Sequence, residues 1–289
     1  MLKQFKKILF GLYSLRNRFL KPKEFDGVKI LLYHDIEHEL FKGHVEYLNS
    51  NYQIITLDEM LRNFSAGIKL KNTFVITFDD GIKENFQLLK TIIRHQIKPT
   101  IFITTGLINT NKRFWFNGLC QKSLIDLLSC SNSNRLKIIN NESEYVGERD
   151  ALNQFEVDQM KKFVDFQPHT ISHPSLVQCS DDELENEIVS SCEAVECITG
   201  EAPHSFAPPF GIYDDRVISI LRKQNIKCSL SLNPGVNFSN DNLFDLKRIG
   251  VPKSCDINEF IVRIDGVWDK IRTLPFLKNF SSFYKQYYE

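Results

Sequence analysis

The sequence predicts an α/β fold, a distorted (β/α) barrel of mostly parallel strands with an insertion after the fourth strand. Short β-branched and aromatic runs alternate with longer segments whose apolar residues recur at helical spacing. Such alternation favours a parallel sheet, because each helix carries the chain back to begin the next parallel strand. The 289 residues, 42% hydrophobic and 25% charged, can bury a sizeable core and suit one large domain better than two small ones.

The predicted strands are short runs with the composition of a buried sheet. They lie at residues 28–33, 52–56, 73–78, 99–105, 205–207, 226–232 and 243–249. The predicted helices have apolar residues at intervals of three and four. They lie at residues 41–49, 57–64, 84–95, 119–128, 181–198, 214–224 and 255–266. Two of these helices begin at capping-box spacings, Thr56 with Glu59 and Ser180 with Glu183.

The chain divides into three predicted parts. Residues 1–26 form a basic amphipathic segment, residues 27–255 the main domain, and residues 256–289 a helical and aromatic tail. The periodicity weakens between about residues 107 and 163, where Asn and Ser runs surround one helical stretch. We therefore expect the insertion there, over the rim of the barrel, where such a segment shapes a pocket.

Charge and cysteine content exclude some classes of function. Lys+Arg and Asp+Glu both total 36, so no overall field attracts nucleic acid, and no arginine-rich or base-stacking motif is present. Seven cysteines form an odd set without Cys-x-x-Cys spacing, in a chain too large to need disulfides. We expect reduced thiols in a cytoplasmic protein that binds no nucleic acid.

The N-terminal segment has two interpretations. Its apolar residues recur at helical spacing between lysines and arginines. They are Phe5, Ile8, Leu9, Leu12, Leu15 and Phe19. No small-x-small cleavage site follows, and no run is long enough to span a bilayer. Residues 1–20 form either a helix on an anionic membrane surface, which would place the protein at the inner membrane face, or a helix docked on its own domain.

Two adjacent carboxylates follow the strand at residues 73–78. Asp79 and Asp80 precede Gly81, where the backbone can turn tightly. Adjacent carboxylates repel one another unless a cation or a shared proton offsets their charge, so the pair indicates a metal or acid/base site. A plain Asp-Asp-Gly turn is the alternative.

Two histidines four positions apart, His169 and His173, follow an apolar segment at residues 163–166. In a single turn of chain, both imidazoles can reach one ion. Two neutral imidazoles and one carboxylate leave a divalent metal with open positions for water and substrate, which is the composition of a catalytic site. Two surface histidines in a proline-bounded loop are the alternative, and the carboxylate pair favours the metal.

These motifs, together with a third at residues 206–211, resemble those of the polysaccharide deacetylases of carbohydrate esterase family 4, which share a NodB homology domain. The matching segments are Thr-Phe-Asp-Asp-Gly at 77–81, His-Thr-Ile-Ser-His at 169–173 and Phe-Ala-Pro-Pro-Phe-Gly at 206–211. They stand in the family's order, and the resemblance spans roughly residues 28 to 252. It implies that the main domain is a catalytic domain.

The resemblance also implies roles for individual residues. Asp79 would be the catalytic base, and Asp80, His169 and His173 would hold one divalent ion. Zinc is the expected ion, and cobalt or nickel suits the same ligands. The third motif supplies the expected substrate contacts, which are Pro209, Phe210 and Gly211.

The third motif departs from the family at one position. It usually opens with an arginine that orients the base, and this chain has Ala207 there. We predict that Arg248 takes this place, because the last strand of a closed sheet would neighbour the first strands. An arginine beside Asp79 would lower its pKa and fix its rotamer. A surface arginine is the alternative.

The general acid is also missing from its usual place. The family's late Leu-x-His motif is absent, since no histidine follows His204. A subgroup of these deacetylases opens with a strand that ends in Tyr-His, and the early histidine there acts as the acid. Tyr33 and His34 match that arrangement, and Asp35 could keep His34 protonated. A histidine capping a strand is the alternative.

The resemblance implies a metal-dependent hydrolase that removes an N-acyl group, expected to be acetyl, from an amino sugar of a cell-surface polysaccharide or its precursor. One alternative is a deformylase or deacylase of a lipid- or nucleotide-linked sugar at the cytoplasmic membrane face. Another is a carbohydrate-binding protein without activity. The aromatic run at residues 114–116 is expected to form the insertion's own core, and a sugar-stacking platform is its alternative.

Overall fold

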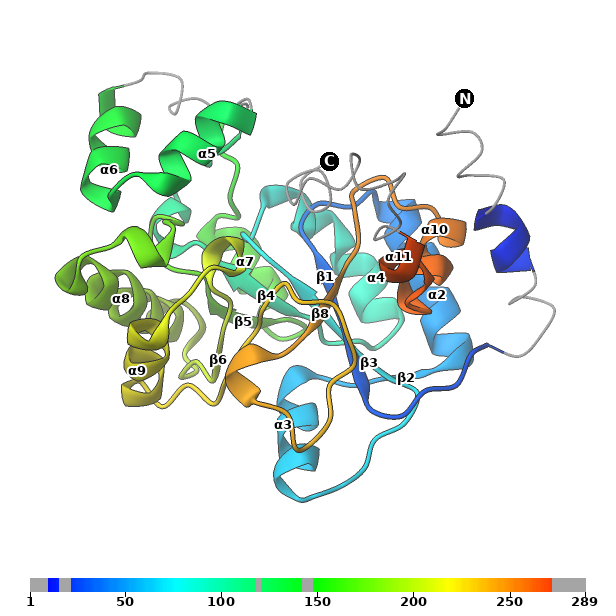
Figure 1. Ribbon diagram of the computed structural model, residues 1–289. Helices are drawn as coiled ribbons and strands as arrows, with labels where there is room; N and C mark the ends of the chain where they lie inside the picture. Colours follow the sequence, from blue (N-terminus) through cyan, green and yellow to red (C-terminus); the bar gives the residue numbers. More distant parts are fainter. Residues whose placement is uncertain (1–9, 16–21, 118–120, 142–147, 272–289) are drawn as a thin grey trace.

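The computed structural model describes residues 10–15, 22–117, 121–141 and 148–271 (Figure 1). The strands are β1 (Val28–Tyr33), β2 (Gln53–Ile54), β3 (Thr73–Phe78), β4 (Thr100–Ile103), β5 (Asp165–Pro168), β6 (Ser205–Phe206), β7 (Cys228–Ser229) and β8 (Arg248–Gly250). The helices are α2 (His38–Asn51), α3 (Leu57–Ser65), α4 (Leu89–Arg94), α5 (Gln121–Ser129), α6 (Asn132–Asn141), α7 (Gln154–Met160), α8 (Asp181–Thr199), α9 (Asp215–Lys223), α10 (Ile257–Ile264) and α11 (Val267–Ile271).

The main sheet has the order β5-β4-β3-β1-β8, with β2 paired to β3, and all of these pairs are parallel. A separate parallel pair is formed by β6 and β7. The Gln167 side chain joins β5 to β6 by accepting the amides of His204 and Ser205. A bridge between Leu230 and Leu246 joins β7 to the segment before β8. The predicted α/β fold with a parallel sheet is confirmed, and the sheet curves into a distorted barrel.

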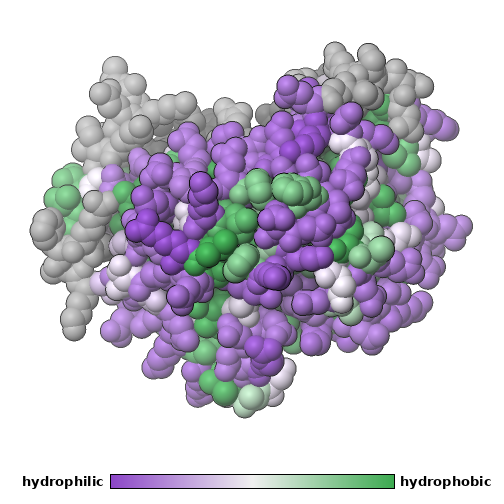
Figure 2. Space-filling view, turned by 180° about the vertical axis from the view of Figure 1, so that it is seen from behind, coloured by the Kyte–Doolittle hydropathy of each residue, from purple (hydrophilic) through white to green (hydrophobic). Residues whose placement is uncertain are grey.

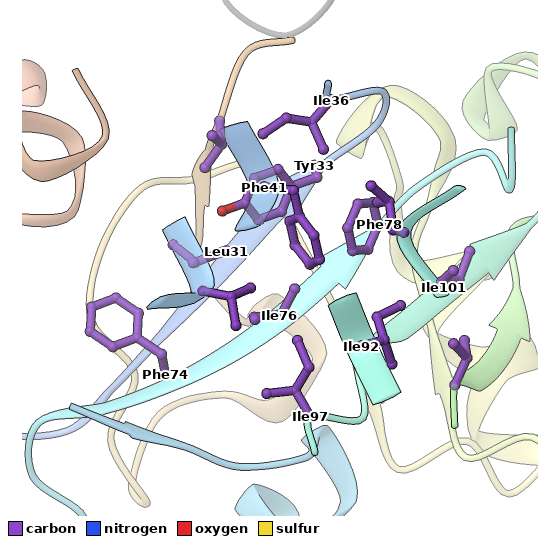
Figure 3. Packing of buried hydrophobic residues seen from close by; sticks show 14 of the residues in the cluster. Leu31, Tyr33, Ile36, Phe41, Phe74, Ile76, Phe78, Ile92, Ile97 and Ile101 are labelled. Carbon is purple, nitrogen blue, oxygen red and sulfur yellow. The ribbon is translucent and has the colours of Figure 1, made fainter. Parts of the chain in front are cut away.

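The core has two layers because the central strands are buried on both faces. β1 and β3 pair from residues 28 and 73 to residues 33 and 78, and every residue of both is buried. Tyr33 and Phe78 stack at 5.1 Å between ring centroids, and Phe41 of α2 packs edge-on against both (Figure 3). The alternate residues, such as Ile30 and Val75, pack with side chains from the other barrel strands. This packing fixes the end of β3, and with it the adjacent carboxylates.

The sequence pattern placed most elements correctly, and both capping boxes are present. Several predictions need correction, and the strands predicted at 52–56 and 99–105 are shortened to β2 and β4. The strand predicted at 226–232 is reduced to β7, and the one at 243–249 is replaced by a 3-10 turn and β8. The helix predicted at 84–95 begins as a 3-10 helix at Lys83–Leu88. The Asn- and Ser-rich run at 132–141 is the helix α6, because tertiary contacts override weak helix propensity.

The described part of the N-terminal segment, residues 10–15, is helical and docks on the C-terminal helices. Phe10 packs edge-on against Trp268, and Tyr13 donates a hydrogen bond to Asp265. Leu12 and Leu15 remain 63% and 52% exposed. Docking is thus observed for these residues, while residues 1–9 and 16–20 of the predicted membrane contact lie outside the described residues.

The rear face of the molecule is mostly hydrophilic and is crossed by a hydrophobic band (Figure 2). No described helix combines the length and the hydropathy that a membrane-spanning segment requires. The predicted insertion contributes α5, α6 and α7, and the first two form an outlying pair on the α8 side of the barrel (Figure 1).

Candidate active site

The two carboxylates emerge from the end of β3 with different partners. Asp79 continues the sheet by donating its amide to the carbonyl of Tyr33. Asp80 and Gly81 then turn the chain with φ of 69° at each. A side chain at Gly81 would lie 2.6 Å from Cγ2 of Ile103, so both the turn and the packing require glycine there. Asp79 and Asp80 are each only 3% exposed.

The two histidines lie in the loop that follows β5. This loop has no helical turn, and its backbone conformation brings the two rings together. Thr170 and His173 have φ of 70° and 54°, and the Thr170 hydroxyl accepts the amide of His173 at 3.0 Å. His169 Nδ1 lies 2.6 Å from the carbonyl oxygen of Ala207. That carbonyl can only accept, so Nδ1 carries a proton and Nε2 is the ring nitrogen available as a metal ligand.

Asp80, His169 and His173 converge as a buried group with the donor set of a divalent metal site. Asp80 Oδ1 lies 3.4 Å from His169 Nε2 and 3.1 Å from His173 Nε2, and the three ligand atoms lie within 4.8 Å of one another. Among the described residues, Asp80 Oδ1 and both ring nitrogens of His173 are buried without a hydrogen-bond partner. Such atoms are costly to bury, and a cation bound between Asp80 Oδ1 and His173 Nε2 would satisfy these two.

The protonation states suit metal binding. Burial lowers the pKa of His173 to about 4, despite the opposing effect of Asp80, so its imidazole is neutral at physiological pH. Burial alone would raise the pKa of Asp80, but protons on the facing Nε2 atoms of the two imidazoles outweigh it and hold that pKa well below its usual range. A bound cation would take the place of those protons. Neutral imidazole and ionised carboxylate are the forms that bind a divalent ion.

Arg248, on β8, lies against Asp79. Its Nη1 and Nη2 donate to the two carboxylate oxygens at 2.7 and 2.8 Å, and its Nε donates to the carbonyl of Ser231. The Arg248 side chain is fully buried. Burial would raise the pKa of Asp79, but the arginine, assisted by His169, holds it below its ordinary value. The register of β8 with β1, which pairs Arg248 with Ile30, makes this contact.

A cleft of about 310 Å³ opens beside Asp80. Its walls come from the loop after β1, the start of the helix after β3, the insertion and the segment after β8. The lining residues are His34, Asp35, Asp80, Ile82, Glu84, Phe114, Phe116, Asn117, Asp150, Val251 and Lys253. His34 therefore lies on the cleft with Asp80. Asp35 forms an ion pair with Lys253, which gives that carboxylate a cation partner other than His34.

The third motif and the aromatic run pack together. Phe210, with φ of 58°, is 3% exposed, and its ring centroid lies 4.6 Å from that of His173. Pro209 is also buried. The expected core role of residues 114–116 is observed, since all three are buried in one cluster with Phe210, although Phe114 and Phe116 also face the cleft. The substrate contacts expected from Pro209, Phe210 and Gly211 stay predictions.

Sequence reasoning missed the residues that hold the histidine loop. Glu187, on α8, accepts the amides of Ile171 and Ser172 at 2.8 and 2.9 Å. Arg135, on α6, donates to the hydroxyl and the carbonyl of Ser172. Neither residue belongs to a sequence motif. The sequence offers one indication of these contacts, which is that the polar residue Ser172 stands between the two histidines.

Comparisons with known proteins agree with this geometry. The family model for polysaccharide deacetylase matches residues 67–229, which is more than half of the chain. The peptidoglycan-N-acetylglucosamine deacetylase of Bacillus cereus is 25% identical over 157 residues, which cover 54% of this chain but only 42% of that protein. The chain thus matches less than half the length of that curated relative.

Solved structures share the fold. The Streptococcus pyogenes deacetylase PplD in complex with acetate superposes with a TM-score of 0.62 at 19% identity, covering 84% of this chain and 99% of that one. IcaB from Ammonifex degensii superposes with a TM-score of 0.61 at 17% identity, covering 79% of this chain and 93% of that one. With its motifs after the ends of β3, β5 and β6 and a family model that spans them, the chain belongs to the polysaccharide deacetylase family.

Proposed function

We propose that this protein is a metal-dependent hydrolase that removes an N-acyl group, in the first instance acetyl, from an amino sugar of a polysaccharide or its precursor. The observation that carries the proposal is the buried group of Asp80, His169 and His173 beside Asp79 and next to the cleft. Family membership supports the carbohydrate substrate, and the donor set supports hydrolysis.

The ligand set suits one divalent ion, for which zinc is the first candidate and cobalt or nickel are alternatives. Such an ion, when bound, supplies the Lewis acidity that polarises the carbonyl of the scissile amide. The protein groups around it supply the proton transfers. Asp79, ionised at neutral pH, accepts a proton from the attacking water, and the two hydrogen bonds from Arg248 fix its rotamer.

The departing amine needs a proton, and we assign this step to His34. It lies on the same cleft as Asp80, on the loop directly after β1. An imidazole titrates near neutral pH, so it can hold a proton and release it in the transition state. Asp79 and His34 would then divide the base and acid roles between two neighbouring strand ends, with the substrate between them.

The proposal is tested with protein loaded with one equivalent of zinc or cobalt. We expect it to release acetate and a free amine from N-acetylglucosamine oligomers, as measured by mass spectrometry. Asp79→Asn should keep its metal and lose turnover by roughly 100-fold or more, as expected for a general base. Metal-loaded protein that deacylates no member of a panel of N-acetyl, N-formyl and lipid-linked amino sugars would refute the assignment.

A further inference from the structure

The histidine loop at residues 170–173 is held in place by side chains from outside the ligand set. His173 has φ of 54°, in the left-handed region, where a residue other than glycine is strained. Such a conformation persists only when its surroundings fix it. The peptide groups on both sides of His173 must therefore be anchored for its ring to face Asp80.

Both carbonyl groups that flank His173 accept hydrogen bonds from the insertion. Arg135 Nη1, from α6, donates to the carbonyl of Ser172 at 3.3 Å, and Trp115 Nε1 donates to the carbonyl of His173 at 2.9 Å. Arg135 Nη2 also donates to the Ser172 hydroxyl at 2.8 Å. That hydroxyl in turn donates to Glu187 of α8. The histidine loop is therefore hydrogen-bonded to the insertion on one side and to α8 on the other.

Arg135 is itself held in a fixed orientation. It is 2% exposed, although it lies on an outlying helix (Figure 1). Its Nε and Nη2 donate to the Asn132 side chain at 3.1 and 2.7 Å, and its guanidinium carbon lies 5.1 Å from the ring centroid of Trp115. A guanidinium bound on several sides positions its donors more firmly than a flexible ammonium would. The burial and the fixed orientation of Arg135 indicate a structural role, which an exposed arginine would not have.

We propose that Arg135 is a positioning residue for the metal ligand His173, acting through Ser172, so that the insertion sets the metal affinity of the site. This inference rests on the proposed function, because it takes Asp80, His169 and His173 as the ligands. Partners of metal ligands orient them, and their removal typically weakens metal affinity by about 10- to 100-fold. The insertion is then part of the metal site as well as a wall of the cleft.

The test measures Co²⁺ binding by absorption spectroscopy, in competition with a chelator, at a temperature where all variants are folded by circular dichroism. We expect Arg135→Gln to bind Co²⁺ at least about 10-fold more weakly and to change the visible spectrum of the bound ion. Arg135→Lys should recover part of the affinity, because one ammonium can still donate to the Ser172 hydroxyl.

Two further variants separate this role from general stabilisation. Arg149 belongs to the same insertion and donates hydrogen bonds to Glu156 and to the carbonyl of Ala151, neither of which is in the histidine loop. Arg149→Gln should therefore leave the Co²⁺ affinity and spectrum unchanged. Ser172→Ala should also weaken binding, and adding Arg135→Gln to it should weaken binding by less than Arg135→Gln does alone.

The outcomes distinguish this inference from the function on which it rests. Suppose that the unaltered protein binds Co²⁺ and deacylates its substrate, and that Arg135→Gln binds Co²⁺ with the same affinity and spectrum. This result would overturn the positioning role of Arg135 and leave the proposed function standing. Equal losses in Arg135→Gln and Arg149→Gln would also overturn that role, since the effect would then be one of general stability. Unaltered protein that binds no Co²⁺ would overturn both proposals.

Discussion

Replacing Arg248 by methionine should destabilise the fold and impair the base at the same time. The side chains of Arg248 and Asp79 are 0% and 4% exposed and share two hydrogen bonds of 2.7 and 2.8 Å. Two unit charges ~4 Å apart interact by about 4 kcal/mol at an effective dielectric constant of ~20. Breaking a buried pair by removing one partner typically costs about 3–5 kcal/mol, because the other charge stays buried without compensation.

The coupling is best measured with a double-mutant cycle on chelated protein. Urea unfolding of Asp79→Asn, Arg248→Met and the double variant should give a coupling free energy of about 4 kcal/mol. Each single change leaves the charge of the other residue buried without its partner. The pair of Arg263 and Glu259 is a matched control, because Glu259 is partly exposed and the pair is better screened. Its coupling free energy should be smaller.

The same variant tests how Arg248 holds the base ionised. In the unaltered protein the pKa of Asp79 is depressed, so its contribution to stability is present above the unfolded pKa of about 3.9 and is lost as pH falls through the folded value. Without Arg248, burial raises the pKa of Asp79 above the unfolded value. The stability gap between the two proteins should then narrow as pH falls toward 4, and the acid limb of kcat/KM should move to higher pH. Additivity within about 0.5 kcal/mol, with an unmoved acid limb, would refute the reasoning.

Three further predictions concern histidines. His173→Ala should lose most of its bound metal, measured by elemental analysis after dialysis, whereas His38→Ala, outside the ligand group, should keep it; equal metal in both would contradict the ligand set. His34→Ala should keep fold and metal yet lose most amide deacylation, with a smaller loss on activated esters whose leaving groups need no proton; equal losses on both substrates would count against His34 as the acid. Burial lowers the pKa of His44 to about 3, so the folded protein keeps this imidazole neutral. Below the unfolded pKa of about 6.5 the unfolded chain binds a proton that the folded protein does not, and the free energy of unfolding declines as pH falls toward 3. Chelated protein should therefore lose about 2 kcal/mol more than His44→Gln between pH 7 and pH 5 in urea unfolding, and parallel pH profiles would rule this out.

Local patterns predicted the parts of the fold that local physics controls. The strand at residues 73–78 has the predicted bounds, because its β-branched and aromatic residues suit a strand buried on both faces. The helix α8 begins at the predicted capping box of Ser180 and ends before Gly200 with φ of 82°. By contrast, α6 has few strong helix-forming residues, and a single sequence gives no sign of the buried Arg135 that ties it to the barrel.

The sequence by itself determined the α/β class, the order of the motifs and their positions after strand ends, because strand composition, turn residues and capping are properties of short segments. Only the tertiary structure decided which side chains meet. Asp79 and Arg248 are 169 residues apart and touch because β8 pairs in one register with β1. Arg135 reaches Ser172 because α6 packs near the loop that follows β5, 37 residues further along the chain. Contacts of this kind depend on strand register and helix packing, which are settled by the whole core and not by any one segment.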